Sequence, residues 1–447
     1  MRAVYVIERR REACHLGRVT QIRDPIHGSI AIDERERAIV DSPYFQRLRS
    51  VRQLGFADLA FPGASHTRYI HALGAAHLAG KIFDAIFARM PHVPSAEQQR
   101  LRAALRVAVL LHDLGHAPFS HASESIMPQR ANLRLPLWST GGSALGQATH
   151  EDYTLKLLLD SELTALLQQM YGPFGLPPEA IASLIAGVPA PGGPYFTVGG
   201  VDHGPLLRQV VSSELDADRM DYLLRDSFYT GVNYGNYDLD WLVGHLGAHV
   251  HDGVAELALA NRAIFAFEDF LLSRYHMFLS VYYHRTPICF DRMLRLYYRE
   301  APGEFEIPHD AAAYLRCDDV KLLTVLRGSK NRWAQRIANR RPFRLLIEAN
   351  PYDTGYDLVG IVGRLERAGI EHFATESLGM VSKYFGEGET AQRIWVHVPD
   401  QRRFVALEDY TPLFRRYESQ VRIARVYVEP SRQPEARRIA GLPIEAD

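Results

Sequence analysis

Apolar residues recur at helical spacing over most of this chain, from about Asp33 to about residue 335. Leu101, Leu105 and Ala108, for example, fall on one face of a helix, and comparable stretches follow one another. Such spacing is typical of amphipathic helices that bury one face in a common core. The sequence therefore predicts a mainly α-helical first part over residues 1–335. The clearest expected helices are Glu34–Asp41, Phe45–Leu54, His71–Met90, Gln98–Leu114, His150–Leu159 and Asn261–Tyr283.

The pattern changes beyond about Arg340, where short apolar runs typical of strands accompany one amphipathic helix. Residues 340–430 are therefore predicted to form a small α/β module, and the polar residues 431–447 a mobile tail. Short strands are also expected within residues 1–30, leading into a turn at Asp24–Gly28. The expected C-terminal elements are the strands Phe343–Glu348, Arg393–Val398 and Val421–Val428 and the helix Tyr356–Ala368.

Charge and cysteine content argue against several functional classes. The formal net charge is −1, so no overall field draws the chain to nucleic acid or to an anionic membrane, and a nucleic-acid partner is not expected. The three cysteines lack a CxxC pattern, which argues against a disulfide framework or a thiolate zinc site. No stretch approaches the roughly 18 to 20 apolar residues that span a bilayer, and the charged N-terminus does not fit a signal peptide. We therefore expect a cytoplasmic protein with no membrane partner.

The dipeptide His112-Asp113 continues the apolar stripe of an expected helix to the point where that helix ends. An imidazole nitrogen and a carboxylate oxygen side by side can hold a divalent metal, but a complete coordination shell needs further ligands. An isolated pair of this kind is better explained by an ordinary core histidine, because such dipeptides occur by chance in long chains. The dipeptide alone is therefore a weak signal.

Two other segments offer further ligands. Upstream, Arg68 and His71 stand beside a turn and the start of a helix. Downstream, Asp218, Tyr222 and Asp226 are spaced at i, i+4 and i+8, so they lie on one helix face. Taken alone, a charged helix face is more often solvated than functional. The weight of the metal-site hypothesis therefore rests on the combination of segments.

Several motifs occur together in an order that resembles one enzyme family. They are Asp24-Pro-Ile-His-Gly28, Phe45-Gln-Arg-Leu-Arg49, Gln53-Leu-Gly55, Phe61-Pro-Gly-Ala-Ser-His66, His112-Asp-Leu-Gly-His-Ala-Pro-Phe-Ser-His121 and Asp218-Arg-Met-Asp-Tyr222. Together they resemble the deoxynucleoside triphosphate triphosphohydrolases of the HD-domain phosphohydrolase superfamily. That family includes a vertebrate enzyme with an additional sterile-alpha-motif domain, and bacterial relatives. The resemblance covers roughly residues 18–300 and implies a helical HD-domain core.

The resemblance implies one divalent transition-metal ion and a defined reaction. The implied ligands are His71, His112, Asp113 and Asp218. Mixed imidazole and carboxylate ligation suits iron, manganese or zinc, and also nickel or cobalt, so the sequence does not select the metal. In the family, metal-activated water attacks the α-phosphorus of a deoxynucleoside triphosphate and releases nucleoside and inorganic triphosphate. Mg²⁺ is expected to accompany the substrate phosphates.

The resemblance assigns proton chemistry to a histidine-rich segment. His121 and Glu124 are predicted to form a proton-donating dyad, although the family more often has aspartate at the second position. His116 and His150 are predicted to orient water or phosphate. The alternative for the dyad is an ordinary pair on a helix surface.

Further residues match positions that contact substrate in the family. Arg219 stands where the family usually has lysine, and Tyr283 where the vertebrate enzyme has glutamine near the base. The base preference is therefore open. The implied contacts are Gln53, Leu54, Tyr222 and Asp226 for the sugar, Arg68, Arg219, Arg274 and His284 for the phosphates, and Tyr282 and Tyr283 beside them.

Two alternative functions stay open. The same metal site would serve a phosphodiesterase or phosphatase that acts on another nucleotide or phosphate ester. A nucleic-acid-binding regulator with an inactive HD fold is the other alternative, with arginines of Lys330–Arg341 contacting phosphates. The family also implies a homodimer or homotetramer. Some members bind a nucleotide activator between subunits, and Asp41, Gln46 and Arg49 match that site.

Overall fold

The first element of the fold is a short hairpin. The computed structural model describes residues 19–350, 355–379, 393–413 and 421–443. Strands β1 (Thr20–Asp24) and β2 (Gly28–Ile32) pair antiparallel. The Asp24 carboxylate accepts hydrogen bonds from the backbone N–H groups two and three residues on, and Gly28 adopts a φ of 74°, which favours glycine. The expected turn and its flanking strands are therefore confirmed within the described residues.

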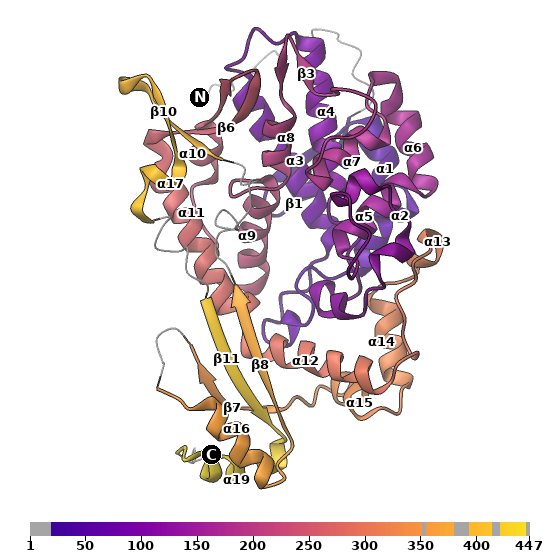
Figure 1. Ribbon diagram of the computed structural model, residues 1–447, viewed down its shortest axis with the longest axis vertical. Coiled ribbons are helices and arrows are strands. Elements are labelled where there is room, and N and C mark those ends of the chain that lie inside the picture. The colour runs from indigo at the N-terminus through magenta and orange to yellow at the C-terminus, as the bar shows by residue number, and fades with distance from the viewer. Residues whose placement is uncertain (1–18, 351–354, 380–392, 414–420, 444–447) are drawn as a thin grey trace, which may run out of the picture.

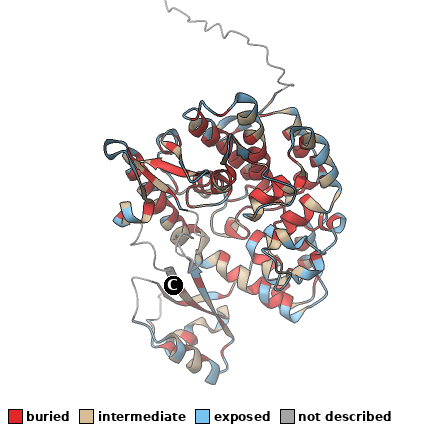
Figure 2. Ribbon diagram, turned by 45° about the horizontal axis from the view of Figure 1, so that its top comes forward, coloured by how far each residue is buried: buried red, intermediate tan, exposed pale blue. Residues whose placement is uncertain are grey.

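A bundle of α-helices forms the body of the molecule (Figure 1). Its centre is α3 (Arg68–Phe87), which packs against α4 (Ser95–Leu111) and α9 (Ala217–Thr230). Residues all around α3 are buried, so it is a core helix rather than a surface one. Figure 2 shows that the buried residues gather in this bundle. The other helices of the body are α1 (Glu34–Val40), α2 (Pro43–Gln46), α5 (His150–Leu159), α6 (Glu162–Tyr171), α7 (Pro178–Ala186), α8 (Gly204–Val211), α10 (Leu239–Gly244), α11 (Ile264–Met277), α12 (Arg285–Glu300), α13 (Ala311–Tyr314), α14 (Asp319–Gly328) and α15 (Arg332–Ala338).

The predicted mainly α fold class is confirmed, but two expected helices differ from the prediction. The helix expected at Phe45–Leu54 ends at Gln46 and continues as a 3₁₀ turn over Arg47–Ser50. At this point the buried Arg47 guanidinium donates hydrogen bonds to the carbonyls of Leu114, His116 and Cys317. The helix α11 continues as a π-helical turn over Phe278–Tyr282, a local widening that is common at functional sites. Among the helices of the described residues, none has the length and apolar character needed to cross a membrane.

A six-stranded sheet flanks the bundle and includes a strand from late in the sequence. Strand β9 (Trp395–Val398) pairs in parallel with β6 (Val254–Ala260). The strand expected at Arg393–Val398 therefore exists, but its assignment to a separate C-terminal module is wrong. Its buried residues Val396 and Val398 belong to the main core. The other strands of this sheet are β3 (Thr197–Val198), β4 (Val201–Asp202), β5 (Leu246–His251) and β10 (Arg403–Ala406), and α17 (Leu407–Tyr410) follows them.

A smaller α/β layer extends away from the body at the C-terminal end (Figure 1). Its three strands pair antiparallel in the order β7–β11–β8, and two helices share a small core with them. The tail predicted to be mobile contains the second of these helices, whose Ala436 and Ala440 are buried, so this prediction is wrong for the described part. The apolar face of this helix is short and stands among many charges, so its helical spacing is a weak signal. The bounds are β7 (Arg344–Ala349), α16 (Leu358–Arg367), β8 (His372–Gly379), β11 (Val421–Val428) and α19 (Gln433–Ala440).

Candidate active site

Three helices bring the four predicted metal ligands together. His71 comes from the first turn of α3, His112 and Asp113 from the end of α4, and Asp218 from the first turn of α9. The carboxylate of Asp216 caps α9 by accepting a hydrogen bond from a backbone N–H in its first turn. That cap fixes where the helix begins and therefore where Asp218 projects.

Two glycines permit the close approach of these elements. A Cβ atom on Gly74 would lie 2.1 Å from a carboxylate oxygen of Asp221, where α3 meets α9. A Cβ atom on Gly115 would lie 2.1 Å from the carbonyl oxygen of His150, where the segment after α4 meets α5. A larger residue at Gly115 would meet the backbone of α5, and one at Gly74 would displace the side chains of Asp221 and Arg225.

The four side chains converge on one small space. The Nε2 atom of His71 lies 3.0 Å from Asp218 Oδ1 and 3.5 Å from Asp113 Oδ2. The Nε2 atom of His112 lies 3.5 Å from Asp218 Oδ1 and 3.4 Å from Asp113 Oδ1. Within the described part of the chain, neither buried Nε2 atom has a hydrogen-bond partner. Buried imidazole nitrogens facing two carboxylates are the donor set of a divalent cation site, so these residues fit a metal ion.

Contacts on the opposite ring nitrogens fix the tautomer of both histidines. The Nδ1–H group of His71 donates to Asp221 Oδ2 at 2.8 Å, and that of His112 donates to the Val109 carbonyl at 2.6 Å. With the proton on Nδ1, each Nε2 atom keeps its lone pair for a metal. The rings are thus held in the orientation that a ligand requires.

The same carboxylates shift the pKa values of the cluster. Burial alone lowers the pKa of His71, but Asp218 and Asp221 raise it to about 10. Burial likewise opposes the charged form of His112, yet Asp113 and Asp218 raise its pKa to about 9. A site that holds a proton this firmly also favours a divalent cation, which would displace that proton on binding.

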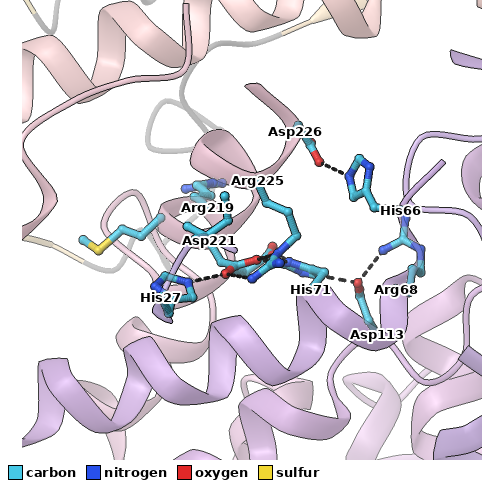
Figure 3. A network of polar contacts seen from close by, with 12 residues as sticks. His27, His66, Arg68, His71, Asp113, Arg219, Asp221, Arg225 and Asp226 are labelled. Atoms are coloured by element: carbon cyan, nitrogen blue, oxygen red, sulfur yellow. Dashed lines mark hydrogen bonds and ion pairs between the residues drawn. The ribbon is translucent and has the colours of Figure 1, made fainter. Parts of the chain in front are cut away.

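Asp221 belongs to a buried network that the sequence did not predict. Figure 3 shows it between His27, His71 and Arg225. The Arg225 guanidinium donates to both carboxylate oxygens of Asp221 and also to Asp24, which joins α9 to the N-terminal hairpin. The spacing offered a signal, because Asp221 and Arg225 stand one helical turn apart on α9.

The predicted catalytic residues form a second cluster beside the ligands. One oxygen of Glu124 accepts hydrogen bonds from His121 Nδ1 at 2.9 Å and from His150 Nδ1 at 2.7 Å. The ring of His116 stacks on that of His150 with centroids 3.9 Å apart, and His116 Nε2 lies 3.2 Å from Asp113 Oδ1. The structure therefore brings these four residues together. The bond from His150 to Glu124 was not predicted.

Two cavities adjoin these clusters. One, of about 310 Å³, is lined by His112, Asp113 and Asp218 and by three arginines. The other, of about 420 Å³, is lined by more apolar and aromatic side chains, including Leu54 and Tyr282. Both are lined by Gln53, Arg68, His121, Tyr222 and Phe278. This shared wall makes them neighbouring compartments of one site.

The three arginines of the first cavity are buried. Arg68 is ion-paired with Asp113. Arg219 Nη1 and Arg274 Nη1 lie 3.3 and 3.0 Å from the two oxygens of Glu214, a residue that the sequence did not single out. Among the described residues, no hydrogen bond reaches Arg219 Nη1 or Arg274 Nε. Buried guanidinium groups with free donors are suited to an anion such as a phosphate.

The second cavity contains the remaining predicted substrate contacts, with one exception. Asp226 accepts hydrogen bonds from His66 Nε2 at 2.7 Å and from the Tyr282 hydroxyl at 2.9 Å. Tyr283 also lines this cavity. His284 lines neither cavity; its Nδ1 accepts from the backbone N–H of Thr286 and caps α12. The phosphate contact of His284 therefore stays a prediction that neither cavity supports.

Comparisons with known proteins support the family. Residues 68–226 match the model of the HD domain, and residues 242–384 match that of the HD associated region. The uncharacterized protein MJ1154 of Methanocaldococcus jannaschii is 31% identical over 74% of this chain and 60% of its own length. The deoxynucleoside triphosphate triphosphohydrolase SAMHD1 of Homo sapiens is 26% identical over 75% of this chain and 50% of its own length. The chain thus spans about half or slightly more of the length of these curated relatives.

A solved structure has a similar fold. The crystal structure of a hypothetical protein from Aquifex aeolicus covers 94% of this chain and 100% of its own, with a TM-score of 0.73 and 26% identity. The metal-ligand cluster described above falls within the segment that matches the HD domain. The chain belongs to the HD-domain phosphohydrolase family, in the group related to the deoxynucleoside triphosphate triphosphohydrolases.

Proposed function

We propose that this protein is a metal-dependent phosphohydrolase that cleaves deoxynucleoside triphosphates into deoxynucleoside and inorganic triphosphate. The observation that carries the proposal is the adjacency of the four-ligand cluster, three buried arginines and a second cavity of about 420 Å³. Cavities of roughly 300–1,000 Å³ with a few convergent polar groups are typical of small-molecule sites. The similarity to SAMHD1 supports the same substrate class.

The metal would be held by His71, His112, Asp113 and Asp218. Iron, manganese or zinc, and also nickel or cobalt, suit this donor set, and Mg²⁺ would accompany the substrate phosphates. When bound, such an ion supplies Lewis acidity that polarises a phosphoryl oxygen and lowers the pKa of water.

The arginines would bind the triphosphate. Arg68, Arg219 and Arg274 are each about 4% exposed, so their charges act in a region largely shielded from water. Glu214 holds Arg219 and Arg274 side by side and leaves donors of both available. A triphosphate would supply the acceptors that these buried donors lack.

The histidine cluster would supply the proton for the departing nucleoside. Burial raises the pKa of Glu124, but hydrogen bonds from His121 and His150 lower it well below its ordinary range, so the carboxylate stays ionised. An ionised Glu124 accepts a hydrogen bond from His121 Nδ1–H and so orients the His121 ring. The His121 Nε2–H group would then donate that proton to the 5′-oxygen of the leaving nucleoside.

The second cavity would hold the sugar. Asp226 has two protein donors, and a carboxylate can accept further hydrogen bonds, so it can also accept one from a 3′-hydroxyl. Tyr222, with Gln53 and Leu54, would pack on the ribose. Tight packing there would exclude a 2′-hydroxyl and favour deoxyribose.

A product assay tests the proposal. Purified protein is incubated with a panel of nucleotides, and the products are separated by chromatography. We expect nucleoside and tripolyphosphate from deoxynucleoside triphosphates. Release of orthophosphate or pyrophosphate would instead support a phosphatase or phosphodiesterase acting on another phosphate ester. No turnover of any deoxynucleoside triphosphate would also contradict the proposal.

Replacing Glu124 by glutamine should lower kcat by on the order of 10²-fold while KM changes little. Glutamine keeps the shape but removes the charge that orients His121 and His150. Steady-state kinetics and metal content are measured together. The Glu124→Asp variant is the matched control, because it keeps the charge and should recover much of the rate. Unchanged kcat in Glu124→Gln would remove His121 and Glu124 from the proposed chemistry.

Assembly and regulation are proposed on the family resemblance. A homodimer or homotetramer would be detected by light scattering. Asp41, Gln46 and Arg49 lie outside both cavity linings; Gln46 donates to the Val40 carbonyl, and Arg49 donates to Gln46. A nucleotide activator at these residues would therefore act at a position separate from the substrate.

A further inference from the structure

Two charged side chains of α12 line the second cavity, which the metal ligands do not line. Asp291 and Arg295 line the cavity of about 420 Å³ but not the cavity of about 310 Å³. They are four residues apart on one helix, so they project from the same face. Neither residue was singled out in the sequence.

Other polar side chains that line this cavity but not the first one already have hydrogen-bond partners within the protein. Asp226 is bonded to His66 and Tyr282. The Ser120 hydroxyl accepts from Arg68 and donates to the Arg52 carbonyl. Asp291 and Arg295 differ, because no hydrogen bond within the described part of the chain reaches the carboxylate of one or the guanidinium of the other.

The environment of Asp291 disfavours the charged form of its carboxyl group. The residue is half-buried, and burial raises the pKa of its carboxyl to about 7, against the opposing effect of Arg295. A carboxylate accepts two parallel N–H bonds, and a guanidinium donates to carbonyl or ring nitrogen acceptors. A ligand that presents two neighbouring N–H groups beside an acceptor would satisfy both side chains.

We propose that Asp291 and Arg295 form a subsite that selects guanine as the base of the substrate. Guanine is the nucleobase whose pairing edge places a ring N–H and an amino group next to a carbonyl oxygen. Asp291 would accept from N1–H and N2–H, and Arg295 would donate to O6 or N7. The inference rests on the proposed function, which places the nucleoside in this cavity with its phosphates at the metal.

A structural role is the competing explanation for Asp291. Both residues also line a smaller cavity of about 180 Å³, together with Thr375, Glu376 and Ser377 of β8. A residue that only joins α12 to β8 would affect stability without changing the choice of base. The ratio of kcat/KM between bases therefore separates the two explanations.

The experiment compares kcat/KM for dGTP, dATP, dCTP and TTP in the metal-loaded full chain. The wild type should prefer dGTP. Asp291→Asn should lower the ratio of dGTP to TTP by on the order of 10- to 100-fold, because the amide presents N–H groups to the donors of guanine. Arg295→Leu should lower the same ratio. Arg295 is exposed, so its replacement should not prevent folding, and this variant tests the subsite if Asp291→Asn fails to fold.

Arg299→Leu is the matched control. Arg299 is exposed on the last turn of α12 and lines neither cavity, so the ratio should not change. Equal kcat/KM for the four bases would overturn the subsite but leave the proposed hydrolysis standing. If the wild type cleaves none of these nucleotides, the affinities for dGTP and dATP are measured by calorimetry instead. Tighter binding of dGTP by the wild type, lost in both variants, would support the guanine subsite although the proposed hydrolysis had failed. Equal affinities for dGTP and dATP would overturn the subsite.

Discussion

Replacing His112 by alanine should remove both the bound metal and the phosphohydrolase activity. The Nε2 atom of His112 faces the Asp113 and Asp218 carboxylates and has no hydrogen-bond partner within the described residues. Without His112, the proposed set of four ligands keeps one imidazole donor, that of His71. We expect metal content to fall more than about tenfold, and kcat/KM by on the order of 10³-fold, since a metal supplies several kcal/mol of transition-state stabilisation.

The measurement is elemental analysis of the purified protein beside steady-state kinetics. His92→Ala is the matched control, because His92 is exposed between α3 and α4 and lines neither cavity. Far-ultraviolet circular dichroism confirms that both variants fold. Wild-type metal stoichiometry in folded His112→Ala would refute the ligand assignment.

Replacing Arg225 by methionine should destabilise the fold by about 3–5 kcal/mol, the typical cost of removing one partner of a buried ion pair. The Arg225 side chain is fully buried and donates at 2.7 and 2.9 Å to Asp221 and at 2.8 Å to Asp24. Methionine fills similar space but leaves two buried carboxylates facing each other. The midpoint of denaturant unfolding measures the loss.

A surface pair provides the control for Arg225. Arg102 is paired with Asp84, and both are substantially exposed, so Arg102→Met should cost less than about 1 kcal/mol. A second effect is expected in Arg225→Met alone. Asp221 accepts a hydrogen bond from His71 Nδ1 and so orients this metal ligand. Loss of such a contact behind a ligand typically lowers metal affinity by about 10- to 100-fold. Equal effects of the two substitutions on unfolding would contradict the role given to the buried network.

The metal ligands were predictable from the family resemblance, because several short motifs occur in the family's order. The His112-Asp113 dipeptide was a weak signal by itself, and the accompanying motifs implied His71 and Asp218 as further ligands. The same resemblance implied the dyad of His121 and Glu124, which are three residues apart. The structure places His121 Nδ1 and Glu124 within hydrogen-bond distance, whereas their roles in the reaction stay predictions.

The partners that act at long range were not predictable. Glu214 joins Arg219 to Arg274, and His150 joins Glu124, through contacts that depend on how separate helices pack. No local spacing encodes such pairs. The same limit explains the placement of β9, because a short apolar strand does not specify which sheet it will join. His284 matched a family position, yet its ring nitrogen accepts a backbone hydrogen bond and caps α12.

The pairing of β9 with β6 also sets an order of events during synthesis. The chain must reach β9 before β6 gains this neighbour, because Trp395 pairs opposite Ala258, far earlier in the sequence. Until then, that edge of β6 presents unpaired backbone groups to any other strand nearby. Contacts between such distant segments slow folding, since a long loop must close first. The body that carries the metal cluster therefore stays incomplete on the ribosome, with an edge open to aggregation, until its late strand emerges.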